Sequence, residues 1–211
     1  MTTTTRWWWV RHAPVEGGGV IYGQDDPAAD CSDPAPFGWL AGVLPRNAVW
    51  IVTQLRRTRQ TAEAIHARWP HGSEPALARP QVEAAFAEQH FGDWQGRSHA
   101  ELAGIRNGAW HRFWLAPADT RPPGGESFTE VVSRVADAVV RLSAEHAGRD
   151  IVAVAHGGSI RAAVALALDL DPEKALALAV DTCSLTRLDH IAGGAGSHTA
   201  DGARSWRVNQ L

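Results

Sequence analysis

The sequence is poor in the residues that mark disulfide-rich, metal-binding and nucleic-acid-binding proteins. It has two cysteines in 211 residues, Cys31 and Cys183, and they form no Cys-x-x-Cys spacing, which argues against a cysteine-based metal site and a disulfide framework. Lys174 is the only lysine, but the 20 Lys and Arg residues are balanced by 23 Asp and Glu; the formal net charge of −3 therefore gives no electrostatic reason to expect binding to nucleic acid or an anionic membrane. We therefore expect a reduced, cytoplasmic protein with no nucleic-acid or membrane partner.

Long apolar runs and common metal- or nucleotide-binding motifs are also missing. No stretch reaches the roughly 20 apolar residues that span a bilayer, and residues 1–5 lack the basic start of a signal peptide. Neither His-Glu-x-x-His nor Gly-x-x-x-x-Gly-Lys occurs. The sequence thus predicts no metal and no other cofactor.

What is present is an alternation of apolar runs with helix-like segments, which predicts an α/β domain with a largely parallel sheet. No repeat and no second domain is visible. We expect one domain over residues 1–211, with a short cap-like insertion at about 98–122. Strands are expected at about 6–11, 49–52, 81–85, 151–155, 183–189 and 204–209, and helices at about 55–69, 99–115, 126–147 and directly after residue 156.

Polar side chains follow several of these strands. Arg11 and His12 end the first apolar run, and Arg57, Glu88 and His156 come at or just after later strand ends. Because the carboxyl ends of parallel strands lie at one edge of a sheet, we expect the five side chains to meet in one cleft.

Two arginines, two histidines and one carboxylate suit phosphoryl transfer. Guanidinium groups bind phosphate oxygens in a bidentate manner. A neutral imidazole can attack phosphorus and form a phosphohistidine. A carboxylic acid can protonate the departing oxygen and then, as carboxylate, activate water. Arginines here take the place of the cation used by other phosphoryl-transfer enzymes, so no metal ion is required.

Five motifs carry a family resemblance. They are Arg11-His12-Ala13, the segment from Thr53 to Ala62, Glu88 to Gly96, Pro123-Gly124-Gly125-Glu126-Ser127, and Ala155-His156-Gly157-Gly158. In this order they resemble the motifs of the histidine phosphatase superfamily, in its phosphoglycerate-mutase-like branch. The resemblance implies a three-layer α/β/α sandwich with a mostly parallel central sheet and a small helical insertion over the active site.

The resemblance also implies roles for individual residues. His12 would be the phosphorylated nucleophile, Glu88 the proton donor, and His156 the third catalytic residue. The substrate would be a small phosphorylated metabolite, and either a monomer or a homodimer is compatible with the family. The phosphate-binding residues would be Arg11, Arg57, His156 and Gly157.

The chain departs from the family pattern next to the nucleophile. Ala13 replaces the usual glycine, and Pro14 replaces an acidic or amide residue. The asparagine often found a few residues later is absent, with glycines at 17–19. We expect the nucleophile to survive these changes and the loop after it to differ.

The loop at residues 20–27 is similar to that of alpha-ribazole phosphatases, which makes this substrate one candidate. Tyr22, Trp110 and Trp114 are the predicted specificity residues, although packing of the insertion explains such aromatics equally well. The short segment 98–122 favours a hydrolase over the alternative, a cofactor-dependent phosphoglycerate mutase. A non-catalytic phospholigand-binding module is disfavoured because His12, Glu88 and His156 are all retained.

Overall fold

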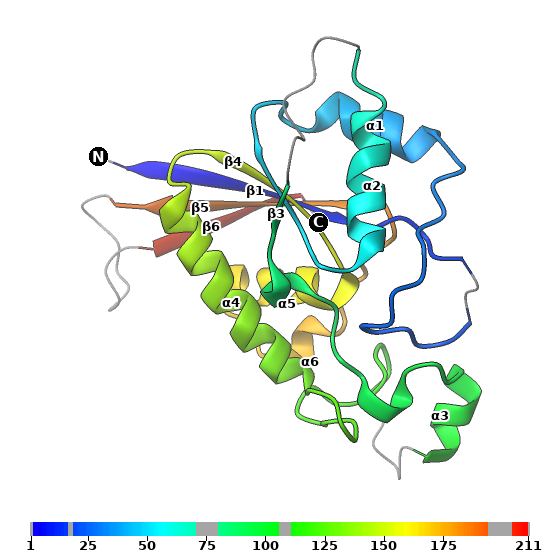
Figure 1. The fold of residues 1–211 in the computed structure, drawn as a ribbon. Helices are drawn as coiled ribbons and strands as arrows, with labels where there is room; N and C mark the ends of the chain where they lie inside the picture. The colour runs from blue at the N-terminus through cyan, green and yellow to red at the C-terminus, as the bar shows by residue number, and fades with distance from the viewer. Residues whose placement is uncertain (1, 17–18, 71–79, 106–110, 194–203, 211) are drawn as a thin grey trace.

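The computed structural model describes residues 2–16, 19–70, 80–105, 111–193 and 204–210. At its centre is a six-stranded sheet with the order β3-β2-β4-β1-β5-β6 (Figure 1). The strands are β1 (Thr3–Arg11), β2 (Val49–Val52), β3 (Gln81–Val82), β4 (Asp150–Ala155), β5 (Leu185–Ala192) and β6 (Arg204–Gln210). The α-helices are α1 (Ala35–Val43), α2 (Arg56–His66), α3 (His99–Ile105), α4 (Phe128–Glu145), α5 (Gly157–Leu168) and α6 (Pro172–Ala175).

The sheet is mostly parallel and is covered on both faces. β1 pairs in parallel with β4, and β2 pairs in parallel with β3 and β4. Only the pairings of β5 with β1 and of β6 with β5 are antiparallel. α1 and α2 lie on one side of the sheet, and α4, α5 and α6 lie on the other (Figure 1). The predicted three-layer α/β/α sandwich is therefore confirmed.

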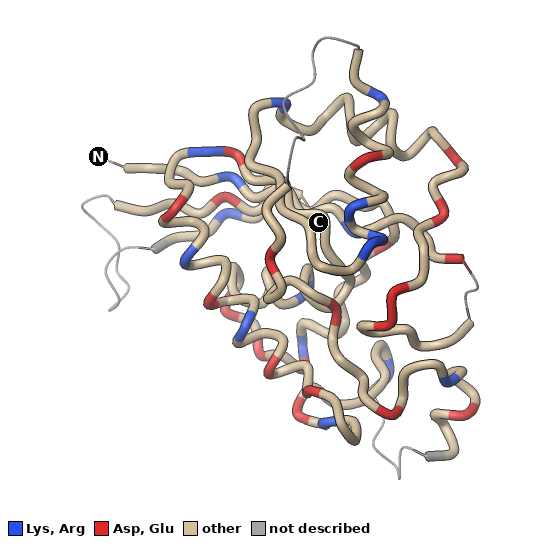
Figure 2. Tube along the Cα trace, viewed as in Figure 1, with Lys and Arg blue, Asp and Glu red and all other residues tan. Residues whose placement is uncertain are grey.

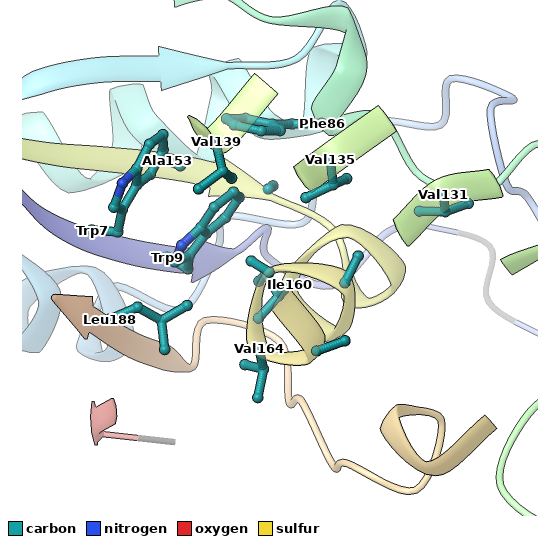
Figure 3. Packing of buried hydrophobic residues seen from close by; sticks show 14 of the residues in the cluster. Trp7, Trp9, Phe86, Val131, Val135, Val139, Ala153, Ile160, Val164 and Leu188 are labelled. Atoms are coloured by element: carbon teal, nitrogen blue, oxygen red, sulfur yellow. The ribbon is translucent and has the colours of Figure 1, made fainter. Parts of the chain in front are cut away.

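The three consecutive tryptophans of β1 are sorted by the two-residue period of a strand. Trp7 and Trp9 are fully buried on the α4 and α5 side, with ring centroids 5.2 Å apart and ring planes inclined by 14° (Figure 3). Trp8 belongs to the other layer, where it packs half-buried against the cluster that includes Phe37 of α1. Rings on both faces fix β1 up to its carboxyl end, where Arg11 lies.

The long helix α4 begins where its sequence supplies a cap. The Ser127 hydroxyl accepts the Glu130 N–H at 3.3 Å, and the Glu130 carboxylate accepts the Ser127 N–H at 2.8 Å. Both the Ser127 N–H and the Glu130 N–H thereby have acceptors. The Glu130 N–H is one of those that the start of a helix leaves without an intrahelical partner. The helix predicted over 126–147 accordingly covers Phe128–Glu145.

The helix predicted over residues 99–115 is wrong in its last part. α3 covers His99–Ile105, and residues 111–115 are not helical: His111 and Trp114 form an isolated β-bridge. Trp114 is held there because its indole N–H donates to the side chain of Gln89 at 3.0 Å. Trp110 lies outside the described residues.

Two predicted strands have different bounds for local reasons. β3 ends at Val82 because the Glu83 carboxylate accepts the Ala85 N–H at 3.0 Å and starts a 3₁₀ turn. β5 starts at Leu185 rather than at residue 183, because Cys183 has a left-handed backbone with φ of +58°.

Basic and acidic residues are interspersed along the trace (Figure 2). No helix among the described residues has the length and apolar character that a bilayer crossing demands.

Candidate active site

The carboxyl ends of β1 and β4 bring two histidines together. The backbone N–H of His12 donates to the Ala155 carbonyl at 3.0 Å. The ring centroids of His12 and His156 lie 5.1 Å apart, and the two ring planes are inclined by 61°. Both side chains are buried. Two of the five side chains predicted to meet are therefore adjacent at this edge of the sheet.

His12 is held as a neutral imidazole with one nitrogen free. Its Nδ1 lies 2.7 Å from the Ala13 carbonyl oxygen, which can only accept, so Nδ1 carries the proton and Nε2 the lone pair. Nε2 is buried and has no hydrogen-bond partner. Burial, together with the charges of Arg57 and Arg11, lowers the pKa of His12 to about 3. The lone pair of Nε2 is thus available at neutral pH.

Ala13, which stands where the family usually has glycine, leaves the hydrogen bonding of His12 intact. Ala13 acts through its backbone: its carbonyl accepts from His12, and its N–H donates to the Thr61 hydroxyl at 2.9 Å. Neither bond needs a particular side chain at this position. The replacement of glycine by alanine therefore does not disturb the orientation of the histidine.

Two arginines are fixed beside His12 by backbone carbonyls. Arg11 Nη1 donates to the Val180 carbonyl at 2.5 Å, while Arg57 Nη1 and Nη2 donate to the carbonyls of Asp25 at 2.8 Å and Gly23 at 2.6 Å. The Nε atoms of both arginines are buried without a partner. Within the described residues neither guanidinium forms an ion pair with a carboxylate. Burial lowers the pKa of Arg57. This unbalanced positive charge makes a site for an anion.

His156 caps the start of helix α5, and its ring lies next to that of His12. Its Nε2 lies 3.0 Å from the Thr53 hydroxyl, whereas its Nδ1 is buried with no partner. Burial and the neighbouring His12 and Arg57 charges hold the pKa of His156 well below its usual value. The ring is therefore neutral at physiological pH, with one nitrogen still available for a ligand.

The carboxylate of Glu88 is held by two backbone N–H groups. Its Oε1 accepts from Gln89 at 2.9 Å and from Gly158 at 3.1 Å. A Cβ at position 158 would lie 2.2 Å from that oxygen, so this close approach requires glycine. The adjacent Gly157 lies beside Arg11, since a Cβ there would be 3.6 Å from Arg11 Nε.

A cavity of about 430 Å³ opens from these residues. Arg11, Tyr22 and Glu88 are among its lining residues, whereas the buried His12, Arg57 and His156 are not. Tyr22 packs against the site, with its ring 6.3 Å from that of His12 and 4.9 Å from Arg57 Cζ. The rest of the lining comprises the apolar residues Val20, Ile21, Phe91, Phe113, Trp114 and Leu115 together with Gly23, His99 and Arg112.

The structure adds two buried residues that the sequence reasoning missed. Arg161 stacks on Trp114, with Cζ 4.6 Å from the ring centroid, and its Nη1 lies 2.9 Å from where a Cβ of Gly157 would be. Gln89 joins Trp114 to the backbone beside Glu88. The helical spacing of four residues between Gly157 and Arg161 is the signal that could have placed Arg161 at the site. Among the described residues no group of His, Cys, Asp or Glu is arranged to hold a metal ion.

Several known proteins are similar to this chain in sequence. A glucosyl-3-phosphoglycerate phosphatase of Mycolicibacterium vanbaalenii is 34% identical over 172 residues, which are 76% of this chain and 73% of the relative. A bifunctional protein of Mycobacterium tuberculosis is 35% identical over 116 residues, 55% of this chain, and the matched region spans only 32% of that longer protein.

Solved structures show the same fold over nearly the whole chain. A mycobacterial glucosyl-3-phosphoglycerate phosphatase superposes with a TM-score of 0.79 and 26% identity, covering 98% of both chains. A putative alpha-ribazole-5'-P phosphatase of Escherichia coli shares the fold with a TM-score of 0.71 at 21% identity, covering 98% of this chain and 96% of the other. The profile of the histidine phosphatase superfamily (branch 1) matches residues 34–200. The chain thus belongs to the histidine phosphatase superfamily.

Proposed function

We propose that the protein hydrolyses small phosphomonoesters through a phosphohistidine intermediate on His12. The observation that carries this proposal is the state of His12: a buried neutral imidazole with Nδ1 bonded to a carbonyl and Nε2 free. Arg11 and Arg57, each with an unpaired Nε–H, supply the positive charge that the phosphoryl group needs. In this proposal residues 98–122 form a cap within the single domain over residues 1–211.

The first chemical step transfers the phosphoryl group to the enzyme. The lone pair of His12 Nε2 attacks phosphorus and forms the N–P bond while the P–O ester bond breaks. Glu88, in its protonated form, gives its proton to the departing oxygen, so the leaving group departs as an alcohol. Arg11 and Arg57 bind the equatorial oxygens, and the free Nδ1 of His156 faces the same group.

The second step returns the enzyme to its starting state. The Glu88 carboxylate takes a proton from a water molecule, and the water oxygen attacks phosphorus as the N–P bond breaks. Inorganic phosphate leaves, His12 regains its lone pair, and Glu88 is again protonated. Each residue is used twice and no further reactant is needed, so we expect activity without a metal or another cofactor.

The cavity next to Glu88 is where the leaving group would lie. The part of its lining formed by Val20, Ile21 and Phe113 offers no side-chain partners for the hydroxyl groups of a sugar. Hydroxyls buried there without partners would weaken binding. We therefore propose a leaving group whose part remote from the phosphate has an aromatic or other apolar surface, as the base of alpha-ribazole phosphate has, with any hydroxyl groups nearer to the polar lining residues Arg11, Tyr22 and Glu88. Glucosyl-3-phosphoglycerate is a second candidate, favoured by the 34% identical relative.

A trapping experiment tests the proposed mechanism. The protein is mixed with a radiolabelled phosphomonoester in excess chelator, denatured, and examined for labelled residues. We expect acid-labile, base-stable label on His12, no label in His12→Ala, and label with slowed turnover in Glu88→Gln, by about 10²–10⁴-fold for a poor leaving group.

The matched control is His146→Gln, a histidine substitution at the end of α4, which we expect to label normally. Acid-stable label on serine or threonine, or activity that depends on added magnesium, would overturn the mechanism. Equimolar transfer of the phosphoryl group within phosphoglycerate, without phosphate release, would identify a mutase. Both cysteines of the chain are free thiols, which supports the proposal that the enzyme acts in the cytoplasm, either as a monomer or as a homodimer.

A further inference from the structure

Gln89 supplies one of the two backbone N–H groups that donate to the Glu88 carboxylate. The Gln89 backbone N–H donates to the Glu88 carboxylate at 2.9 Å, and the Gln89 side chain is itself buried. The Glu88 carbonyl, which belongs to the same peptide group as the Gln89 N–H, accepts from the side chain of Gln24 at 3.0 Å and from Arg134 at 3.3 Å. The Gln89 side chain, held by its own hydrogen bonds, anchors the Cα atom at the other end of that peptide group. The position of the carboxylate therefore follows the position of the Gln89 peptide.

Trp114 determines how the Gln89 side chain lies. An indole N–H can only donate, so the bond of 3.0 Å from Trp114 Nε1 selects the Gln89 oxygen. The amide nitrogen of Gln89 then points the other way and donates to the Glu126 carbonyl at 2.8 Å. Without the indole N–H, the Gln89 oxygen has no donor here, and the amide can rotate.

The Trp114 ring is fixed from its other side. Arg161 lies over the ring at 4.6 Å, and Arg161 Nε donates to the Leu178 carbonyl at 2.8 Å. Trp114 also lines the cavity that opens next to Glu88. Trp114 thus both lines the cavity and bonds to Gln89, the residue whose backbone N–H donates to the Glu88 carboxylate.

We propose that Trp114 is a positioning residue for the proton donor, acting through Gln89 on the Glu88 carboxylate. This inference rests on the proposed function, in which Glu88 protonates the leaving oxygen. A misplaced acid slows the reaction in proportion to how much the leaving group needs the proton. A strongly basic alkoxide needs it, whereas 4-nitrophenolate leaves readily without it.

The test compares kcat/KM for benzyl phosphate and 4-nitrophenyl phosphate, two esters with aromatic groups of similar size but very different leaving-group basicity. Trp114→Phe keeps a ring and removes the N–H. We expect it to lower kcat/KM for benzyl phosphate by about tenfold or more, and for 4-nitrophenyl phosphate by less than about twofold. Gln89→Met is expected to give the same selective loss, and the double variant no greater one, because both act through one contact.

Trp69→Phe is the matched control. It also removes a buried indole hydrogen bond, of 2.7 Å to the Ala41 carbonyl, but between α1 and the end of α2, and it should leave the ratio of the two substrates unchanged. Thermal unfolding of each variant verifies that it is folded.

An equal loss on both substrates, or no loss on benzyl phosphate, would overturn the positioning role. A wild-type protein that hydrolyses neither ester would instead overturn the proposed function, so the two failures are distinguishable. Losses that add fully in the double variant would also contradict a shared path through Gln89.

Discussion

The substitution Gly158→Ala should separate activity from stability. Gly158 is the second residue of α5, and its backbone is not in the left-handed region, so alanine fits the helix. The new Cβ would lie 2.2 Å from Glu88 Oε1, and restoring an ordinary contact displaces the carboxylate by about 1 Å. A displacement of about 1 Å in a catalytic group can lower the rate by about 10²-fold.

The stability change should be small by comparison. Alanine in a helix is favoured over glycine by about 0.5–1 kcal/mol, which offsets much of the roughly 0.5–1.5 kcal/mol of the lost hydrogen bond from the Gly158 N–H to the Glu88 side chain. Glu88 also borders the cavity, so its side chain has room to move. We expect the free energy of unfolding to change by less than about 2 kcal/mol.

Urea unfolding and kcat/KM on benzyl phosphate measure the two effects. Gly38→Ala in α1 is the control, because no atom lies within 4 Å of its added Cβ; it should stabilise the protein slightly and leave activity unchanged. Full activity in Gly158→Ala would refute the view that Glu88 works from the position seen in the structure. A loss of stability above about 3 kcal/mol would show that the carboxylate cannot move into the cavity.

The free energy of unfolding should fall as the pH drops from 7 to 5. His12, His66 and His156 have lowered pKa values and stay neutral in the folded protein, whereas the same histidines become protonated in the unfolded chain below about pH 6.5. Each contributes a slope of up to about 1.4 kcal/mol per pH unit, measured by urea unfolding; a flat profile would contradict the neutral state of these rings. Phe113→Ser should raise the KM of aryl phosphates roughly fivefold with little change in kcat, because Phe113 lines the cavity, whereas the exposed Trp39→Ser should not; an unchanged KM would exclude Phe113 from leaving-group binding.

The strands that carry the candidate site were predictable because each is a dense apolar run with an abrupt polar end. The run from Trp7 to Val10 stops at Arg11-His12, and the run of β4 stops at His156. In a parallel sheet such strand ends lie at one edge, which is why the sequence alone predicts that Arg11, His12 and His156 lie close together. The roles assigned to these side chains stay predictions until they are measured.

Other parts depend on packing that the sequence does not display. Helix α1 contains two glycines and no charged residue, and it lacks a polar face; it is helical because Phe37 and Leu40 are buried against the sheet. The support of His12 is equally hidden, since it comes from the Ala13 carbonyl rather than from a side chain. The link from Trp114 to Gln89 joins residues 25 positions apart, and no spacing rule relates them.

The two hydrogen bonds from Arg57 to the carbonyls of Gly23 and Asp25 restrict how the loop that holds these carbonyls can change in evolution. The same loop is tied to Gln95, whose side chain donates to the Asp25 carboxylate at 2.9 Å. An insertion or deletion among residues 22–25 would move those carbonyls and release the guanidinium that we propose binds phosphate. Because backbone carbonyls rather than side chains hold Arg57, we expect the length of this loop to vary less among descendants of this chain than the identity of its side chains.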